Sequence, residues 1–207
     1  MSIKEHLNFI QNQINQIAFE SGRSPQEIKL IAVSKTKPIE LIREAINAGH
    51  ITFGENYVQE ALDKIKNIGS DQKIEWHFLG LLQKNKAKFC PGNFHWIHTV
   101  NSIALSKKIE NHCAINNKIM NVLIQVNLSK EDSKSGLEEL EDVLRVAENI
   151  LLCKFLKLRG LMTIPKPKLG EIETRKIFEK IRNWKDKLRE EFNTSEITEL
   201  SMGMTAD

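Results

Sequence analysis

The sequence predicts an α/β protein with a parallel sheet, in the form of a (β/α)8 TIM barrel. Short apolar segments rich in β-branched residues alternate with amphipathic segments of helical period. Seven such steps without a change in composition favour one domain over residues 1–207. A doubly wound sheet would give the same alternation. The barrel is favoured because no GxGxxG turn follows the first strand, and because polar residues cluster just after the strands, at Lys35, Glu55, Asn56, Gly80, Asn101, Asn127–Ser129, Thr163 and Ser201.

The elements follow from local patterns. Apolar residues at three- and four-residue steps predict an N-terminal helix over about residues 2–20. The run at 30–33 lacks polar alternation, which predicts a strand buried on both faces. Pro38 and Gly49 mark the start and end of the next helix. Further strands are expected at 51–54, 74–80, 96–100, 121–127, 158–164 and 199–204. Further helices are expected after residue 57, after Asn101 or Ser102 as the N-cap, over 137–150, and around Phe178–Leu188.

The composition excludes several classes of protein. The 207 residues carry 30 basic and 27 acidic side chains, a balance that argues against a nucleic-acid or membrane-surface protein. The three cysteines form neither a disulfide framework nor a CxxC zinc motif, which favours a reducing compartment. The N-terminal segment has no apolar core of a signal peptide, and no run of apolar residues is long enough for a membrane span. We therefore expect a cytoplasmic protein.

Lys35 is the leading candidate for chemistry. It comes directly after an apolar strand, in the segment IAVSKTKP. A lysine at the carboxyl end of a barrel strand points toward a partly desolvated mouth, where the neutral amine needed for a Schiff base is favoured. The alternative interpretation is an ordinary surface lysine at the start of a loop.

Other candidates have a structural alternative too. Asn56 could bind a ligand or cap the next helix, and His77 could line the barrel or be buried in its core. The basic run Lys84, Lys86 and Lys88 is usual for a solvated helix face, although it could attract an anion. Ser129, Ser133, Ser135 and Gly136 lie in a polar loop that could contact a ligand or only turn the chain.

The end of the chain suggests a phosphate site, while the histidines suggest no metal site. Ser201 and Gly203 fit the phosphate-binding backbone that follows the last strands of many barrels, although an ordinary buried strand would look the same. His95 and His98 are spaced as HxxH near an expected strand, where alternate residues face opposite sides, so the two rings do not converge.

Seven segments together resemble the pyridoxal-phosphate homeostasis proteins, which are related to the N-terminal barrel of alanine racemase. They occur in family order across nearly the whole chain, and this order makes the resemblance specific. The segments are IAVSKTKP (31–38), FGENYVQEAL (53–62), EWHFLG with QKNK (75–80 and 83–86), NVLIQVN (121–127), SKSG (133–136), RGLMTIP (159–165) and LSMGM (200–204).

The resemblance implies a barrel of the alanine racemase N-terminal-domain type that holds pyridoxal 5′-phosphate (PLP) as a Schiff base on Lys35. It implies a role in intracellular PLP and amino-acid homeostasis, with PLP-dependent apo-enzymes as candidate partners and a monomer or weak dimer as the assembly. The implied cofactor-binding residues are Lys35, Asn56, His77, Met162, Ser201, Met202 and Gly203.

The residues favour binding without catalysis. Racemases of this fold use a lysine and a tyrosine from a second β-domain, and here the single tyrosine, Tyr57, begins the helix after the second strand. A PLP-dependent racemase is the first alternative. A cofactor-free aldolase with a Lys35 Schiff base and an interaction module without a working site are the others.

Two departures from the family pattern stand out. Leu81 and Lys84 replace the usual proline and serine. Family members continue after LSMGM with a helix and an eighth strand that carries an Arg-Ile-Gly-Thr motif, whereas this sequence ends at Asp207. We therefore expect a C-terminally truncated barrel that lacks the final helix and strand, with weaker phosphate anchoring and lower stability than a longer relative.

Overall fold

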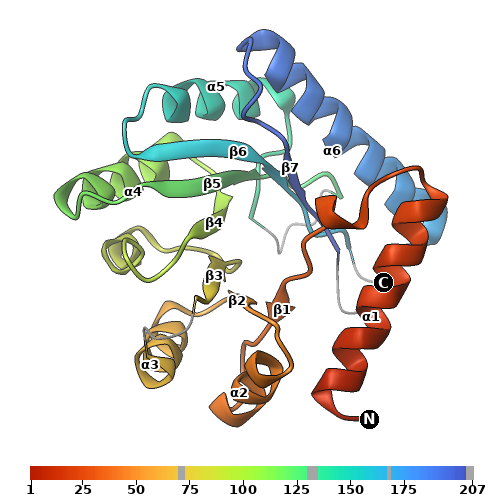
Figure 1. The fold of residues 1–207 in the computed structure, drawn as a ribbon. Coiled ribbons are helices and arrows are strands. Elements are labelled where there is room, and N and C mark those ends of the chain that lie inside the picture. The colour runs from red at the N-terminus through yellow and green to blue at the C-terminus, as the bar shows by residue number, and fades with distance from the viewer. Residues whose placement is uncertain (70–72, 130–134, 167–168, 204–207) are drawn as a thin grey trace. The chain divides into compact units, whose positions relative to one another are not determined.

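The computed structural model describes residues 1–69, 73–129, 135–166 and 169–203. The chain forms two compact units, Met1–His77 and Phe78–Asp207. Strands and helices alternate along both units, as the ribbon in Figure 1 shows. The alternation predicted from the sequence is therefore confirmed.

The first unit contains a parallel β-sheet with helices between its strands. Ala32 pairs with Phe53 and Val33 with Gly54, which places the ends of the first two strands at the same level. The elements are α1 (Ile3–Glu20), η1 (Pro25–Glu27), β1 (Ala32–Val33), α2 (Ile39–Asn47), β2 (Thr52–Glu55), α3 (Val58–Ile68) and β3 (Glu75–Phe78), whose last residue belongs to the second unit.

Helix α1 confirms the helix expected over residues 2–20. Its start is fixed by a capping box, in which the Ser2 hydroxyl accepts from the Glu5 N–H and the Glu5 carboxylate accepts from the Ser2 N–H. The helix packs on α2 but buries only Ala18 fully. Phe19 is 83% exposed, so much of the apolar surface of α1 faces solvent.

The first strand differs most from its prediction. The segment 30–33 is predicted to be buried on both faces, but β1 is only two residues long and Val33 is 47% exposed. In the described part of the first unit, β1 pairs with β2 alone, so one of its edges has no neighbouring strand. Apolar composition alone does not distinguish such an edge strand from a central one.

The second unit has four parallel strands in the order β4-β5-β6-β7. The Ser102 hydroxyl accepts from the Leu105 N–H, which confirms Ser102 as the N-cap of α4. Its elements are η2 (Lys84–Phe89), β4 (Trp96–Val100), α4 (Ile103–Ile115), β5 (Met120–Gln125), α5 (Leu140–Leu151), β6 (Leu156–Met162), α6 (Glu171–Glu191) and β7 (Glu199–Ser201).

Differences from the expected bounds are local. Helix α5 begins at Leu140, later than expected, because Leu137 instead bridges to Val126. The basic run Lys84–Lys88 lies on the short 3-10 helix η2 rather than on an α-helix. Strand β7 ends at Ser201, and Met204, the last residue of the expected strand, lies outside the described residues.

The core of the second unit lies between the sheet and its helices. Val122 and Ile124 of β5 are fully buried, as are Val143 of α5 and Ile181 of α6. The buried positions of α6 recur at steps of three or four residues, as expected for a helix that buries one apolar stripe. They are Ile177, Ile181, Trp184 and Leu188. This packed layer supports β6 and β7, the strands that carry the start of the RGLMTIP segment and the start of the LSMGM segment.

Two buried cysteines are expected to make the protein less stable at alkaline pH. Cys90 and Cys113 are fully buried, and desolvation raises the pKa of each thiol from 9.0 to about 12. Between pH 9 and 12 the unfolded chain therefore loses these protons while the folded chain keeps them. We expect the free energy of unfolding to fall by up to about 1.4 kcal/mol per pH unit for each thiol in this range.

Urea unfolding at a series of pH values checks this expectation. The Cys90→Ala/Cys113→Ala variant, although less stable at pH 8, should lose less stability than the parent between pH 9 and 11. Parallel curves for the two proteins would contradict a contribution from these thiols. Cys153, which is only half-buried, should react first with a thiol reagent at pH 8.

Candidate functional site

Lys35 and Asn56 follow two paired strands of the first unit. The Ser34 N–H donates to the Gly54 carbonyl oxygen at 2.9 Å, which continues the β1–β2 pairing by one residue. Lys35 and Asn56 are the next residues along each strand and therefore lie at the same end of this strand pair. Lys35 is exposed, so the desolvation expected at this position is not present in the structure.

Lys35 lies in a tight turn whose geometry is unusual. The Lys37 N–H donates to the Ser34 carbonyl oxygen at 3.1 Å, so Lys35 and Thr36 are the two central residues of a β-turn. Thr36 has a φ of 61°, in the left-handed region that a β-branched residue rarely adopts. Gly or Asn is the usual residue at the corresponding position of a type II turn.

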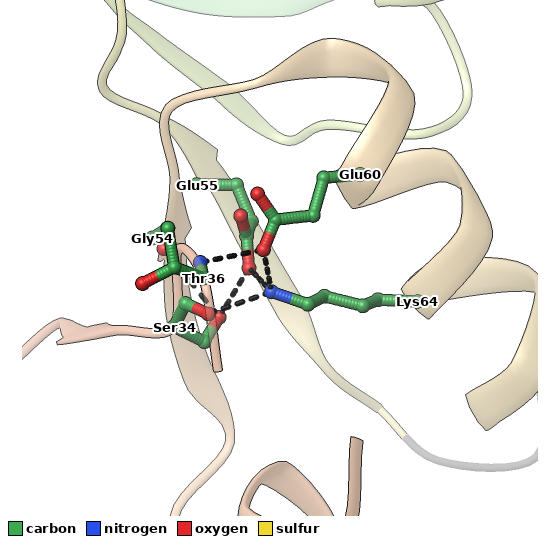
Figure 2. A network of polar contacts seen from close by, with 6 residues as sticks. All are labelled: Ser34, Thr36, Gly54, Glu55, Glu60 and Lys64. Carbon is green, nitrogen blue, oxygen red and sulfur yellow. Dashed lines mark hydrogen bonds and ion pairs between the residues drawn. The ribbon is translucent and has the colours of Figure 1, made fainter. Parts of the chain in front are cut away.

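A cluster of charged side chains binds this turn (Figure 2). Lys64 Nζ from α3 donates to Glu55 Oε1 at 2.7 Å, to Glu60 Oε1 at 2.6 Å and to the Ser34 carbonyl oxygen at 2.6 Å. The Ser34 hydroxyl also donates to Glu55 Oε1, at 2.6 Å. We call Glu55, Glu60 and Lys64 the Lys64 cluster.

The sequence pattern does not reveal the Lys64 cluster. Glu55 stands out in it only as a polar residue after a strand. Glu60 and Lys64 are four residues apart on α3, a spacing that indicates an ion pair but usually an exposed one. In the structure the side chains of Lys64 and Glu55 are only 8% and 0% exposed, so their ion pair is buried.

Other candidates of the first unit take the following positions. Tyr57, not Asn56, is the N-cap of α3 and has no side-chain capping bond, so the capping alternative for Asn56 is wrong. Asn56 is half-buried, and Tyr57 is 58% exposed. His77 is 2% exposed within β3, and its Nε2 lies 3.6 Å from Glu75 Oε1. A buried histidine was the more common outcome considered for this position.

The second unit brings Met162 and Ser201 side by side. They are register partners at the ends of β6 and β7, and the Thr163 N–H donates to the Ser201 carbonyl oxygen at 3.0 Å. Met162 is 3% exposed and Ser201 is half-buried. Met202 and Gly203 follow Ser201 and are exposed, with Gly203 at a φ of 125°.

His98 belongs to the candidate site, although the sequence pattern does not indicate it there. The pattern presents His98 only as a possible metal ligand together with His95. In the structure His98 is 3% exposed on β4, and its Nδ1 lies 2.8 Å from Ser201 Oγ. Because β4 and β7 are not adjacent strands, no local spacing in the sequence indicates this hydrogen bond.

The polar loop after β5 folds back on the end of that strand. The Asn127 N–H donates to the Leu137 carbonyl oxygen at 2.9 Å, and the Leu137 N–H donates to the Gln125 carbonyl oxygen at 2.9 Å. Ser135 Oγ donates to Gln125 Oε1 at 3.3 Å. Ser129 and Gly136 are half-buried, and Ser133 lies outside the described residues.

The described residues contain neither a metal-binding cluster nor a membrane-spanning helix. Residues 1–69, 73–129, 135–166 and 169–203 hold no group of three or more His, Cys, Asp or Glu side chains that could bind a metal ion. In the same part of the chain, no helix combines the length and the apolar character needed to cross a lipid bilayer.

Comparison with known proteins defines first the class of the fold. Residues 6–207 match the family described as alanine racemase, N-terminal domain. A crystal structure of an unknown protein from Bifidobacterium adolescentis superimposes with a TM-score of 0.88 at 30% identity, covering 99% of this chain and 87% of that one. The predicted α/β fold of the alanine racemase N-terminal-domain type is thus confirmed, with seven parallel strands in the described residues.

The relatives then define the family. The pyridoxal phosphate homeostasis protein of Haemophilus influenzae is 40% identical over 208 residues, which cover 100% of this chain and 87% of that protein. The structure of PipY from Synechococcus elongatus PCC7942 with PLP bound superimposes with a TM-score of 0.82 at 34% identity, covering 94% of this chain and 90% of PipY. The chain belongs to the pyridoxal phosphate homeostasis protein family.

Proposed function

We propose that this protein binds PLP covalently through Lys35 and takes part in PLP homeostasis without catalysing a reaction of its own. The observation that carries the proposal is the position of Lys35. It is an exposed lysine in a turn that Lys64 and Glu60 hold at the end of β1, in a chain whose relative PipY has a structure with PLP bound.

The residues present fit the chemistry that this cofactor requires. The Lys35 amine condenses with the aldehyde carbon of PLP, a C=N bond forms, and one water molecule leaves. The reverse reaction with water releases the cofactor, as a carrier requires. The half-buried Asn56 lies at the same end of the β1–β2 pair as Lys35 and, like the buried His77, is proposed to contact the ring.

The proposed phosphate-binding residues are those around the end of β7. The His98 ring fixes the Ser201 hydroxyl at 2.8 Å, and Met202 and Gly203, which follow it directly, are exposed residues. A hydroxyl and exposed N–H groups are typical ligands of a phosphate. Met162 is buried beside Ser201 and is proposed to contribute an apolar surface to the same part of the site.

A non-catalytic function is proposed because we assign no residue in the described part of the chain to the second base that racemisation needs. Tyr57 is the single tyrosine of the chain and is 58% exposed, so it has no enclosed position from which to exchange a proton with a substrate. We further propose that the protein works in the cytoplasm as a monomer or weak dimer. PLP-dependent apo-enzymes are the proposed recipients of the cofactor.

Titration with PLP followed by visible absorbance tests the proposed function. We expect the parent to form an imine chromophore with one equivalent of PLP. Lys35→Ala should lose that chromophore, because no other amine occupies the turn position. Lys37→Ala is the matched control, since Lys37 is an exposed lysine two residues away. Saturable imine formation by Lys35→Ala, or its absence from the parent, would refute the proposal.

Ser201→Ala tests the proposed phosphate contact. A hydrogen bond to a charged group contributes about 1.5–3 kcal/mol, so we expect PLP binding to weaken by about tenfold or more. Binding of pyridoxal, which has the same aldehyde but no phosphate, should not change. Equal losses for PLP and pyridoxal would indicate a general disturbance of the fold and argue against a phosphate contact at Ser201.

A further inference from the structure

One ion pair binds the peptide groups on both sides of Lys35 (Figure 2). Lys64 Nζ donates to the carbonyl oxygen of Ser34, which belongs to the peptide group before Lys35. The Thr36 N–H belongs to the peptide group after Lys35 and donates to Glu60 Oε1 at 2.6 Å. Because Lys64 Nζ and Glu60 Oε1 are themselves 2.6 Å apart, the pair fixes the backbone around the α-carbon of Lys35.

The turn held in this way is strained. A left-handed backbone brings the β-carbon of an ordinary residue too close to the following carbonyl oxygen, and the branched Thr36 side chain adds to this crowding. Such a conformation persists only where the surroundings supply enough interactions to hold it. The hydrogen bond from the Thr36 N–H to the Glu60 carboxylate is a charge-assisted interaction of this kind.

The groups that hold the turn are themselves fixed. The three donors of the Lys64 ammonium match the three acceptors within hydrogen-bond distance, namely the oxygens of Ser34, Glu55 and Glu60. Glu55 is fully buried and accepts in addition from the Ser34 hydroxyl. The long Lys64 side chain is therefore held in one position, which makes it a rigid support.

We propose that Glu60 and Lys64 are positioning residues that hold Lys35 in the conformation in which its amine forms the imine with PLP. The inference rests on the proposed function, because it assigns the Lys64 cluster a role in presenting the same lysine. Lys35 itself is exposed, and its side chain has no hydrogen bond or ion pair with the residues that the structure describes. The support of the turn therefore decides where its amine lies. Glu60 acts on Thr36 and Lys64 acts on Ser34.

A rescue experiment separates positioning from a purely structural role. Glu60→Ala removes the acceptor of the Thr36 N–H and should weaken imine formation with PLP by about tenfold, the penalty expected when a left-handed β-branched residue loses its support. Glycine adopts a positive φ without that penalty. The double variant Glu60→Ala/Thr36→Gly should therefore recover binding to within about threefold of the parent. Asp63→Ala, an exposed acidic position on the same helix, is the control and should leave binding unchanged.

The binding of the double variant decides between a positioning role and any other role of Glu60. Recovery by Thr36→Gly supports positioning, because glycine restores neither the charge of Glu60 nor a contact of that side chain with the cofactor. If the double variant binds no better than Glu60→Ala, the proposal is wrong. Circular dichroism of each variant verifies that it is folded, and Glu60→Gln, which keeps an acceptor oxygen, serves as the milder variant if Glu60→Ala does not fold.

A readout without PLP distinguishes failure of this inference from failure of the proposed function. Exchange of the Thr36 amide hydrogen in the cofactor-free protein should be slow in the parent and in Asp63→Ala, and fast in Glu60→Ala. Equal exchange rates in all three proteins would overturn the inference even if Lys35 binds PLP. Conversely, a parent that protects the Thr36 amide but forms no imine would refute the proposed function and leave the support of the turn established.

Discussion

Replacement of Lys64 by methionine is expected to lower the free energy of unfolding by about 3–5 kcal/mol. The variant keeps the length and apolar stem of the side chain but removes the ammonium. The carboxylate of Glu55, which is 0% exposed, then remains buried with only the Ser34 hydroxyl as a donor. The loss is large because an unpaired buried charge is much more costly than an exposed one.

Urea unfolding of Lys64→Met and a matched variant measures this effect. Lys66→Met changes an exposed lysine two residues further along α3 and should alter stability by no more than about 0.5 kcal/mol. Adding Glu55→Gln to Lys64→Met should recover part of the loss, because it removes the charge that lost its partner. A loss of less than about 1 kcal/mol in Lys64→Met would show that this ion pair does not stabilise the fold.

The second large effect is expected for Gly160→Ala in β6. A β-carbon at this position would lie 1.8 Å from the carbonyl oxygen of Glu199, so the two strands cannot keep their present separation. Gly160 and Glu199 are register partners, and the pairs Leu161–Leu200 and Met162–Ser201 follow them. We expect β7 to shift away from β6 and the protein to lose about 3 kcal/mol or more of stability.

The displacement of β7 should also affect binding. Ser201 would leave its position beside His98, so PLP affinity should fall more than pyridoxal affinity. Gly170→Ala is the matched control, since a β-carbon there meets no atom within 4 Å. Its effect on stability should remain below about 1 kcal/mol. A Gly160→Ala variant with the stability of the control would contradict the close approach of β6 and β7.

The sequence was most informative where local physical rules act. The predicted N-cap at Asn101 or Ser102 depends on a side chain and an N–H group within three residues of each other, and a pattern of that length is visible in the chain. The strand at 96–100 has its predicted bounds, and the polar Asn101 follows its last residue. The order of the motifs along the chain was sufficient to indicate the family.

The sequence was least informative where partners are distant. The exposure of Val33 depends on whether a strand lies beside β1, which the composition of that segment does not specify. The hydrogen bond between His98 and Ser201 joins residues 103 positions apart. Lys64 looks like any lysine on an amphipathic helix, and only the packing of α3 against the ends of β1 and β2 makes it buried and ion-paired. Long-range contacts therefore determine the parts of the site that a one-dimensional pattern does not reveal.

Mapping of the reduced adduct tests the central claim most directly. The protein is mixed with one equivalent of PLP, reduced with borohydride, digested and analysed by mass spectrometry. We expect one phosphopyridoxyl group per chain, located on Lys35. Label distributed over Lys37 and other exposed lysines, with little on Lys35, would contradict the claim that the turn after β1 presents the amine that binds the cofactor.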